Sequence, residues 1–491
     1  MARLQPDAPL LTSPRHTWCW KDFAHQMEVA AAALRTTGIE GGERLVVVSE
    51  NSPTTLVLLL AAQMLRVWPA VINARLPAGE VRSLIQCAQP RLVLFSTEDS
   101  DSSRHHAQEM QAAPYDIPNL GPIRLVRQQP SIGPQPLAPD PADEIGTLIF
   151  TSGTTGKPKA VMISQRGLLN QGTVVGGGRG TRAQDTIEIV APLSHVMGTS
   201  SVLCALLYGA CMRIQPRMAA ADLVSAIARG NVTQVSMVPV AWAKLLDQIE
   251  TERIDVSGNR LRTLVAGGAP LDPELKSRIE HTFGKAVQNA YGMTEVAPLA
   301  RTPSGRPSLP WSVGRPDANV QVRIVDEHGA QVMPGEVGEI QASGPSVMKG
   351  YFANPEATAE VMRDQGWFAT GDLGRWLDDG DLAVVGRRKE MIIRSGFNVY
   401  PAEVEAALAT HPAVLHAAVV GEPAALGDET VVAYLQLRDP QAAGEALRGN
   451  IAAHARMHLA PYKIPSVMAF VESMPLGSTG KILKRELKRV R

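Results

Sequence analysis

A short loop rich in glycine and hydroxyl side chains follows the apolar run at residues 148–150. Its two glycines tolerate positive φ, so several backbone N–H groups can point toward one anion without a Cβ in the way. The hydroxyl groups and a lysine add donors and positive charge, and charge-assisted hydrogen bonds are the strong ones in such a site. We therefore interpret the segment as a phosphate-binding loop. Its residues are Thr151, Ser152, Gly153, Thr154, Thr155, Gly156 and Lys157.

The spacing of this loop excludes the P-loop of Walker-type nucleoside triphosphatases. That motif separates its glycines more widely and places a serine or threonine directly after the lysine. Here only Thr154 and Thr155 stand between the glycines, and Pro158 follows Lys157. A surface turn rich in glycine and threonine is the alternative that the loop by itself leaves open.

A second segment, residues 289–295, offers groups that a nucleotide needs. Tyr291 has a flat aromatic face for a base, Thr294 a hydroxyl for a phosphate, and Glu295 the carboxylate oxygens that Mg²⁺ prefers. An ordinary strand end is the alternative. The other members are Asn289, Ala290, Gly292 and Met293. An earlier turn of small residues would let a flat base approach the backbone: Gly267, Gly268, Ala269 and Pro270.

Further polar positions lie in the last third of the chain. Asp372 stands between glycines, a setting that suits acceptance of both hydroxyls of a ribose, although a turn carboxylate is the alternative. Arg387 and Lys389 belong to the basic segment 386–390. Lys481 ends a glycine-bearing loop close to the C-terminus and, taken alone, has the pattern of a solvated tail lysine.

The composition of the chain bounds its class. With 491 residues, 45% hydrophobic and 20% charged, it has the make-up of a globular protein of more than one domain. Lysine plus arginine equals aspartate plus glutamate, so no general attraction to nucleic acid or an anionic membrane is expected. The longest apolar run, residues 56–65, is too short for a membrane span. We expect no signal peptide, and four scattered cysteines predict reduced thiols in a cytoplasmic protein.

Alternating strand and helix patterns position the motifs. They predict an α/β fold with two similar sheet layers, then a smaller β region at residues 320–341, then a small α+β domain after Gly386. Because ligand sites in α/β sheets gather where strands end, we expect the motifs on loops that follow strands. Strands are expected at residues 45–48, 70–72, 92–95, 187–190, 234–238 and 263–265, and helices at 53–65, 78–87, 220–229 and 242–249.

Taken together and in this order, the motifs resemble those of the adenylate-forming superfamily of acyl-CoA synthetases, nonribosomal adenylation domains and luciferases. The resemblance extends from the first α/β unit to the Lys481 loop. It implies a large N-terminal domain, residues 1–388, that binds ATP and an acid, and a small mobile C-terminal domain, residues 389–491. It also implies a two-step reaction, in which ATP and a carboxylic acid form an acyl-adenylate and pyrophosphate, and a thiol then displaces AMP.

The resemblance also implies roles for individual residues. Lys481 would reach between the substrate carboxylate and the α-phosphate and stabilise the transition state, while His195 would gate the acid site. Lys389 would be the hinge of the small domain, and the loop with Ser395 and Gly396 would approach the pantetheine tunnel. The implied ATP contacts are residues 151–157 for the β- and γ-phosphates, Thr294 for the α-phosphate, Glu295 for Mg²⁺, residues 267–270 and 289–293 around adenine, and Asp372 and Arg387 for the ribose.

The positions implied for the acid are small and largely apolar, which favours an aromatic or medium-chain aliphatic acid. Coenzyme A is the expected acceptor, with a carrier protein as the alternative, and a homodimer is kept open. We interpret Arg301 and Arg306 as solvated, with an anchor for a second carboxylate as the alternative. The implied acid-site residues are Ser236, Gly268, Ala290, Gly292, Val296 and Ala297.

Overall fold

A computed structural model of the protein describes residues 3–152, 158–303, 312–394, 397–424, 428–475 and 482–487. Contacts divide the chain into two compact units. The first comprises Met1–Ser308, Gly314–Gln321 and Ala342–Phe368, and the second comprises Leu309–Val313, Val322–Gln341 and Ala369–Arg491. The predicted boundary between residues 388 and 389 concerns a hinge motion and stays a prediction.

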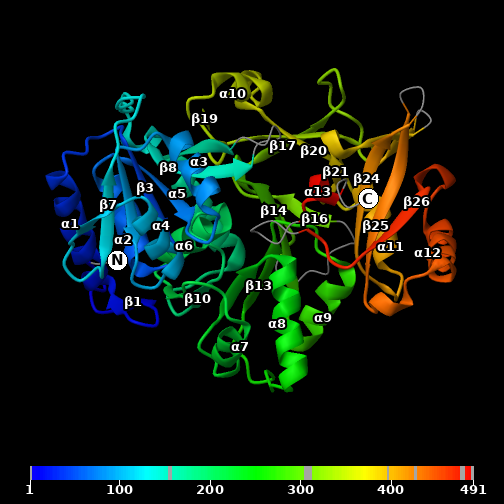
Figure 1. Ribbon diagram of the computed structural model, residues 1–491, viewed down its shortest axis with the longest axis horizontal. Coiled ribbons are helices and arrows are strands. Elements are labelled where there is room, and N and C mark those ends of the chain that lie inside the picture. Colours follow the sequence, from blue (N-terminus) through cyan, green and yellow to red (C-terminus); the bar gives the residue numbers. More distant parts are fainter. Residues whose placement is uncertain are drawn as a thin grey trace. The chain divides into compact units, whose positions relative to one another are not determined.

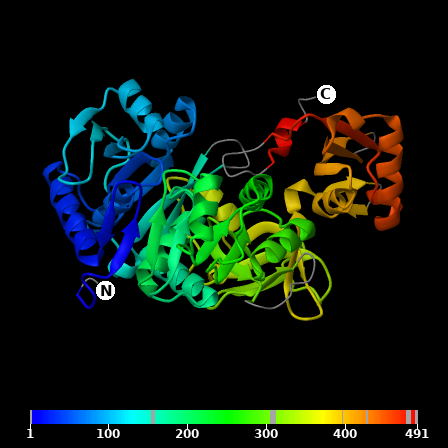
Figure 2. The same cartoon turned by 90° about the horizontal axis from the view of Figure 1, so that it is seen from below.

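The first unit contains an eight-stranded sheet with parallel central strands, as the β-branched runs predict. Alternate side chains of β3 (Arg44–Ser49) point to opposite faces, so Val47 packs with α1 and α2 while Val46 packs with α3 and α4. Helices therefore cover both faces (Figures 1 and 2). The other strands are β4 (Trp68–Asn73), β5 (Leu92–Ser96), β6 (Ala113–Tyr115), β7 (Ile123–Arg127), β8 (Ile145–Ser152), β9 (Pro158–Ser164) and β19 (Gly350–Tyr351), and the helices are α1 (Trp20–Thr36), α2 (Pro53–Met64), α3 (Ala78–Ala88), α4 (Asp101–Glu109) and, beside β19, α10 (Pro355–Val361).

A second sheet of this unit repeats the arrangement. Strands β14, β13, β12, β10, β11 and β1 are parallel neighbours in that order, and α7, α8 and α9 cover one face. These strands are β14 (Val287–Met293), β13 (Thr263–Gly267), β12 (Gln234–Met237), β10 (Thr186–Ile189), β11 (Cys211–Ile214) and β1 (Pro9–Thr12), with antiparallel β2 (Thr17–Cys19), β15 (Val296–Arg301) and β16 (Ser312–Pro316). The helices are α5 (Gln165–Arg179), α6 (Val196–Tyr208), α7 (Ala220–Ala228), α8 (Pro239–Glu252) and α9 (Pro273–Phe283).

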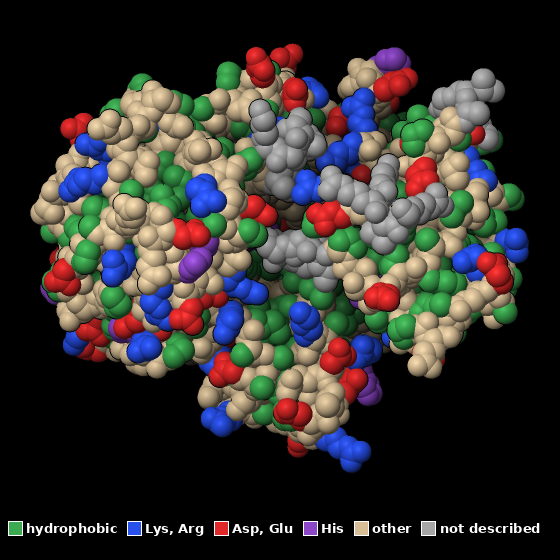
Figure 3. All heavy atoms as spheres, in the orientation of Figure 1, with side chains coloured by type: hydrophobic (Ala, Val, Ile, Leu, Met, Phe, Trp, Pro, Cys, Tyr) green, Lys and Arg blue, Asp and Glu red, His purple; other side chains and the backbone are tan. Residues whose placement is uncertain are grey.

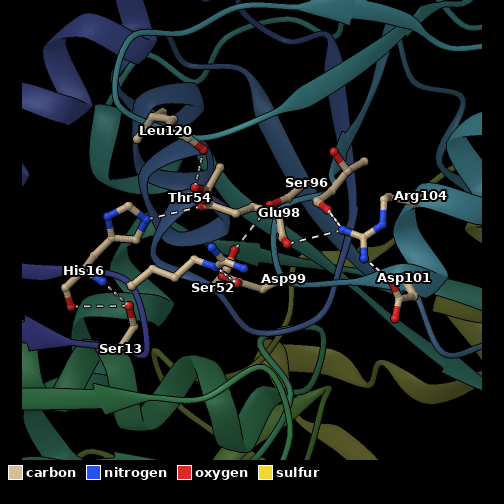
Figure 4. Close-up of polar contacts among 12 residues, drawn as sticks. Ser13, His16, Ser52, Thr54, Ser96, Glu98, Asp99, Asp101, Arg104 and Leu120 are labelled. Atoms are coloured by element: carbon tan, nitrogen blue, oxygen red, sulfur yellow. Dashed lines mark hydrogen bonds and ion pairs between the residues drawn. The ribbon is translucent and has the colours of Figure 1, made fainter.

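One buried hydrophobic cluster joins the two sheets. It contains Leu45 of β3 and Ile187 of β10 together with side chains of α1, α2, α5 and α6, so this helix layer is shared. Polar contacts accompany this packing. His16 Nε2 in the β1–β2 turn lies 3.3 Å from Glu98 Oε2 after β5, and the Thr54 hydroxyl of α2 donates to the Leu120 carbonyl at 2.7 Å (Figure 4). The prediction of two similar α/β layers is confirmed.

The second unit contains a small sheet and the C-terminal α+β region, both as predicted. In the latter, α11 and α12 pack on one face of the sheet β24-β25-β26, while Leu487 of the short α13 packs on the other. The bounds are β17 (Gln321–Val325), β18 (Gly338–Ser343), β20 (Phe368–Trp376), β21 (Leu382–Arg387), β22 (Ile392–Arg394), β23 (Phe397–Val399), α11 (Pro401–Ala409), β24 (Val414–Pro423), β25 (Glu429–Leu437), α12 (Glu445–His458), β26 (Val467–Val471) and α13 (Lys484–Leu487).

Basic and acidic side chains are interspersed over the face of the first unit drawn in Figure 3. That mixture agrees with the balanced composition. Within the described ranges, every helix is too short or too polar to cross a bilayer.

Candidate active site

The predicted phosphate loop connects two antiparallel strands. Thr151 of β8 pairs with Lys159 of β9, and Ser152 pairs with Pro158, so both ends of the loop are held in register. The loop residues Gly153, Thr154, Thr155, Gly156 and Lys157 lie outside the described residues. The returning strand β9 was missed by the sequence analysis, although a short apolar run is visible at residues 160–163.

Glu295 and Thr294 lie in a two-residue turn between β14 and β15. Met293 pairs with Val296, so the two residues between them form the tip of an antiparallel hairpin. Both side chains are largely buried, at 9% exposure for Thr294 and 7% for Glu295. A buried carboxylate needs hydrogen-bond partners, and those partners show what the site is built to hold in place.

One such partner is Tyr351, which the sequence analysis missed. Strand β19 pairs with β9, and the Tyr351 hydroxyl donates a 2.9 Å hydrogen bond to Glu295 Oε1. The ring also lies under the Lys159 ammonium, 4.7 Å from its centre. Burial and the charge of Glu295 raise the pKa of Tyr351, so the phenol stays protonated and keeps donating. Tyr351 thus links the phosphate-loop hairpin to the carboxylate predicted to bind Mg²⁺.

The two segments predicted to frame adenine lie side by side. Gly267 of β13 pairs with Ala290 of β14, and a Cβ at Gly267 would lie 2.9 Å from the Ala290 carbonyl oxygen. Gly268 has φ +79°, which favours glycine. Ala269 and Pro270 follow in the connection to α9. The expectation that this motif occupies a loop is wrong for Asn289, Ala290, Tyr291, Gly292 and Met293, which are strand residues of β14. All of them except Gly292 pair with a neighbouring strand, and Gly292 lies at a shift in register between Tyr291 and Met293.

His195 is the N-cap of α6. Its Nδ1 accepts a hydrogen bond from the Met197 backbone N–H at 3.2 Å, which leaves the proton of a neutral ring on Nε2. Burial lowers the pKa of His195, which favours this neutral form. Met197 brings the start of α6 to the adenine segments, because its Cε would lie 3.5 Å from a Cβ on Gly267 or on Gly268.

The predicted ribose pair lies in the second unit. Asp372 of β20 and Arg387 of β21 are opposite each other in an antiparallel pair, and Arg387 Nε lies 3.4 Å from Asp372 Oδ1. Strand pairing therefore fixes the carboxylate, which is 7% exposed. The Thr370 hydroxyl accepts from the Asp372 N–H at 3.0 Å. Asp372 too lies within a strand and not on a loop.

The remaining predicted positions border the C-terminal region. Lys389 lies in the short turn Arg388–Glu390, while Ser395, Gly396 and Lys481 lie outside the described residues. The chain on either side of 476–481 is anchored, because the Leu483 N–H donates to the Pro475 carbonyl at 2.8 Å. Lys484 Nζ then reaches Glu390 at 3.3 Å and Glu405 at 2.7 Å.

We compared the chain with known protein families. Residues 1–352 match the family of AMP-binding enzymes, and residues 403–481 match the AMP-binding enzyme C-terminal domain. The chain belongs to the AMP-binding enzymes. It is 32% identical to a feruloyl-CoA synthase of Amycolatopsis over 99% of this chain and 97% of the relative.

Two solved structures are similar along their whole length. ATP-bound MatB from Rhodopseudomonas palustris has a TM-score of 0.86 and 26% identity, with 100% of this chain and 98% of that chain covered. An o-succinylbenzoate-CoA synthetase from Bacillus subtilis, in complex with ATP and magnesium, has a TM-score of 0.83 and 27% identity over 99% and 98%. This AMP-binding enzyme is accordingly an ATP- and magnesium-dependent ligase that joins a carboxylic acid to coenzyme A through an acyl-adenylate.

The described residues fit a magnesium ion that binds as a complex with ATP. They contain no cluster of three or more histidine, cysteine, aspartate or glutamate side chains that could hold a metal ion. Mg²⁺ is usually bound by one or two carboxylates together with substrate phosphates. A single protein carboxylate, that of Glu295, is therefore enough for an ion that binds together with ATP.

One expectation about the acid site is wrong. Arg301 is not solvated, because its side chain is 13% exposed and forms an ion pair with Asp317. It also donates to the backbone carbonyls of Val174 and Val175 in α5. Since these groups satisfy it, the alternative role as a second-carboxylate anchor loses its support for Arg301. Arg306 lies outside the described residues.

A separate hollow of about 460 Å³ opens where β3, β4, β5 and β11 end. Two of its acidic side chains have partners, since Asp99 accepts from Arg15 Nε at 2.7 Å and Asp101 pairs with Arg104 (Figure 4). The sequence analysis assigned it no role. It is lined by Glu50, Arg75, Asp99, Asp101, Ser102, Gln215, Pro216 and Arg217.

Proposed function

We propose that this ligase activates an aromatic carboxylic acid and transfers it to coenzyme A. The observation that carries the proposal is the convergence of small and apolar groups beside His195. A Cβ on Gly268 would lie 3.4 Å from Val238 and 3.5 Å from Met197, so a bulkier residue there would fill the space that a flat ring needs. The names of a feruloyl-CoA synthase and an o-succinylbenzoate-CoA synthetase among the similar proteins support the same class of acid.

In the first step, Glu295 would hold Mg²⁺, and the bound ion would neutralise phosphate charge during attack by the acid. Tyr351 would orient the Glu295 carboxylate, because its hydroxyl donates to one of the two carboxylate oxygens. Thr294 would contact the α-phosphate. Lys481 would place its ammonium where negative charge develops, an effect of about 2.7–4 kcal/mol when such a donor is removed.

In the second step, the C-terminal region would turn about Lys389 and take Lys481 out of the site. The loop with Ser395 and Gly396 would then face the pantetheine. A neutral His195 supports the proposed gate, because an uncharged ring moves between two environments without a desolvation cost for an ion.

We further propose a cytoplasmic protein, with a homodimer as the assembly to be tested by light scattering. Free cysteines at positions 19, 87, 204 and 211 support a reducing compartment.

A panel of aromatic, fatty and dicarboxylic acids tests the function, with pyrophosphate release measured with and without coenzyme A. We expect adenylate formation without the thiol and thioester formation with it, fastest for an aromatic acid. Faster transfer to a phosphopantetheinylated carrier protein than to coenzyme A would favour the alternative acceptor. A preference for fatty acids would overturn the proposed substrate class.

A further inference from the structure

A buried arginine that no mechanism has used lies at the end of α5. Arg179 is 8% exposed, and within the described residues its guanidinium makes one hydrogen bond, from Nη2 to the Ser236 hydroxyl at 3.3 Å. A guanidinium carries five donor hydrogens. A single neutral acceptor therefore leaves most of its donor capacity available.

The surroundings of Arg179 hold an excess of positive charge. Among the described residues, the carboxylate that influences Arg179 is that of Asp317, which already pairs with Arg301. The neighbouring Cys204 adds no negative charge, because burial raises the pKa of its thiol. Burial also raises the pKa of Asp317, and a protonated Asp317 would only increase the imbalance. The cluster of Arg179, Arg301 and Asp317 thus carries a net charge of at least about +1.

Within the described residues, Arg179 forms no ion pair with an aspartate or glutamate. The residues outside the described ranges contain no aspartate or glutamate. Two other arginines of the same unit are compensated by carboxylates: Arg213 contacts Glu188 at 2.8 Å and Asp222 at 2.6 Å, and Arg262 contacts Asp185 at 2.6 Å. The buried Arg44 donates instead to backbone carbonyls, among them those of Gly133 and Gln89. An uncompensated buried charge is costly unless a partner pairs with it.

The position of Arg179 relates it to the acid site. Its acceptor Ser236 is on β12. Val238, two residues later, is the N-cap of α8 but still has an extended backbone (φ −74°, ψ 153°), so its side chain is expected on the same face as that of Ser236. Val238 lies against Gly268 in the proposed acid site. Since a strand rises about 3.3 Å per residue, the Ser236 level lies roughly 6–7 Å farther along the same wall. A guanidinium there can meet the far end of an acid whose near end reaches Gly268.

We propose that Arg179 binds a second anionic group, a carboxylate or sulfonate, at the distal end of the acid substrate. The inference rests on the proposed function and narrows it to a dianionic acid. Arg179 is then a residue that determines specificity, with Ser236 orienting its guanidinium, and Arg301 and Asp317 supporting the cluster. Hydrogen bonds to charged groups contribute about 1.5–3 kcal/mol each, which corresponds to a factor of about 10–100 in preference.

The test compares matched acids on the wild type and on Arg179→Met. Each aromatic dicarboxylic acid, such as terephthalate and longer homologues, is paired with analogues whose distal carboxylate is replaced by a methyl or a carboxamide group. The measured quantity is the ratio of kcat/KM for the dianionic acid to that for each analogue. We expect this ratio to favour the diacid in the wild type and to fall about 10–100-fold in Arg179→Met.

Two further variants make the result specific. Arg179→Lys keeps the positive charge but lacks the planar guanidinium, so it should reduce the ratio less than Arg179→Met does. It replaces Arg179→Met in the test if the methionine variant does not fold. Arg213→Met removes a partly buried arginine of the same unit and should leave the ratio unchanged. An equal ratio in wild type and both Arg179 variants, or equal use of diacid and carboxamide by the wild type, would overturn the proposal.

Failure of the proposed function would look different. If the wild type released pyrophosphate with none of the acids, the assignment of the acid class would fail. Calorimetric titration of the same acid pairs into wild type and Arg179→Met, in the presence of a non-hydrolysable ATP analogue, would still decide whether Arg179 recognises the second anion. Tighter binding of the diacid by the wild type alone supports the proposal, and equal binding refutes it.

Discussion

The Tyr351 hydroxyl donates a 2.9 Å hydrogen bond to Glu295 Oε1, although Tyr351 of β19 and Glu295 in the β14–β15 turn are 56 residues apart in sequence. The contact couples the strand that returns from the phosphate loop to the proposed magnesium ligand. It exists because β19 pairs with β9, which places the phenol ring beside Lys159 and its hydroxyl at the β14–β15 turn.

Tyr351→Phe should weaken the use of MgATP while the fold is kept. Loss of a hydrogen bond to a charged group costs about 1.5–3 kcal/mol, so kcat/KM for MgATP in ATP–pyrophosphate exchange should fall about 10–100-fold. Tyr115→Phe is the control, because the Tyr115 hydroxyl donates to the Ala33 carbonyl instead. Similar exchange rates for Tyr351→Phe and wild type at all magnesium concentrations would remove Tyr351 from the site.

Lys481→Ala should separate the two half-reactions. Adenylate formation should fall at least about 10²–10³-fold, because preorganised positive charge at the transition state is lost. Thioester formation from synthetic acyl-adenylate and coenzyme A should stay within a few-fold of the wild type. Lys276→Ala, which removes a surface lysine paired with Glu280, controls for loss of charge. Equal losses in both half-reactions would contradict the role of Lys481.

Lys389→Pro should affect the second half-reaction more than the first. Proline fixes φ near −65° and restricts rotation at the proposed hinge. Lys389→Ala, which leaves φ free, is the matched control and should retain both rates. Single-turnover measurements of adenylate formation and of thioester formation check the prediction. A parallel decline of the two rates would count against a hinge at this position.

The protonation of His195 predicts how stability depends on pH. Because burial lowers its pKa, the folded protein takes up a proton less readily than the unfolded chain, whose histidine titrates near 6.5. The free energy of unfolding should therefore fall as the pH drops through about 6.5 and level off below the folded pKa. The difference in unfolding free energy between wild type and His195→Gln, from urea titrations between pH 8 and 5, should shrink over this range. A difference independent of pH would show that burial leaves the His195 pKa unshifted.

Local sequence was sufficient to predict much of this protein. Glycine, hydroxyl and lysine side chains predict a phosphate loop because their conformational and donor properties are intrinsic. Apolar runs that alternate with helical segments predicted the two sheet layers, since parallel strands covered by helices are buried on both faces. The pair Thr294 and Glu295 was predicted from local sequence as well, because its chemistry lies within one short segment.

Only the tertiary structure decided which distant groups meet. Strand pairing brought Tyr351 to Glu295, which no local pattern indicates. Burial turned Arg301 from an expected surface residue into the partner of Asp317, and left Arg179 without a carboxylate of its own. The physical reason is that charge compensation and strand pairing depend on distances in space, whereas residue type and periodicity are properties of the chain alone.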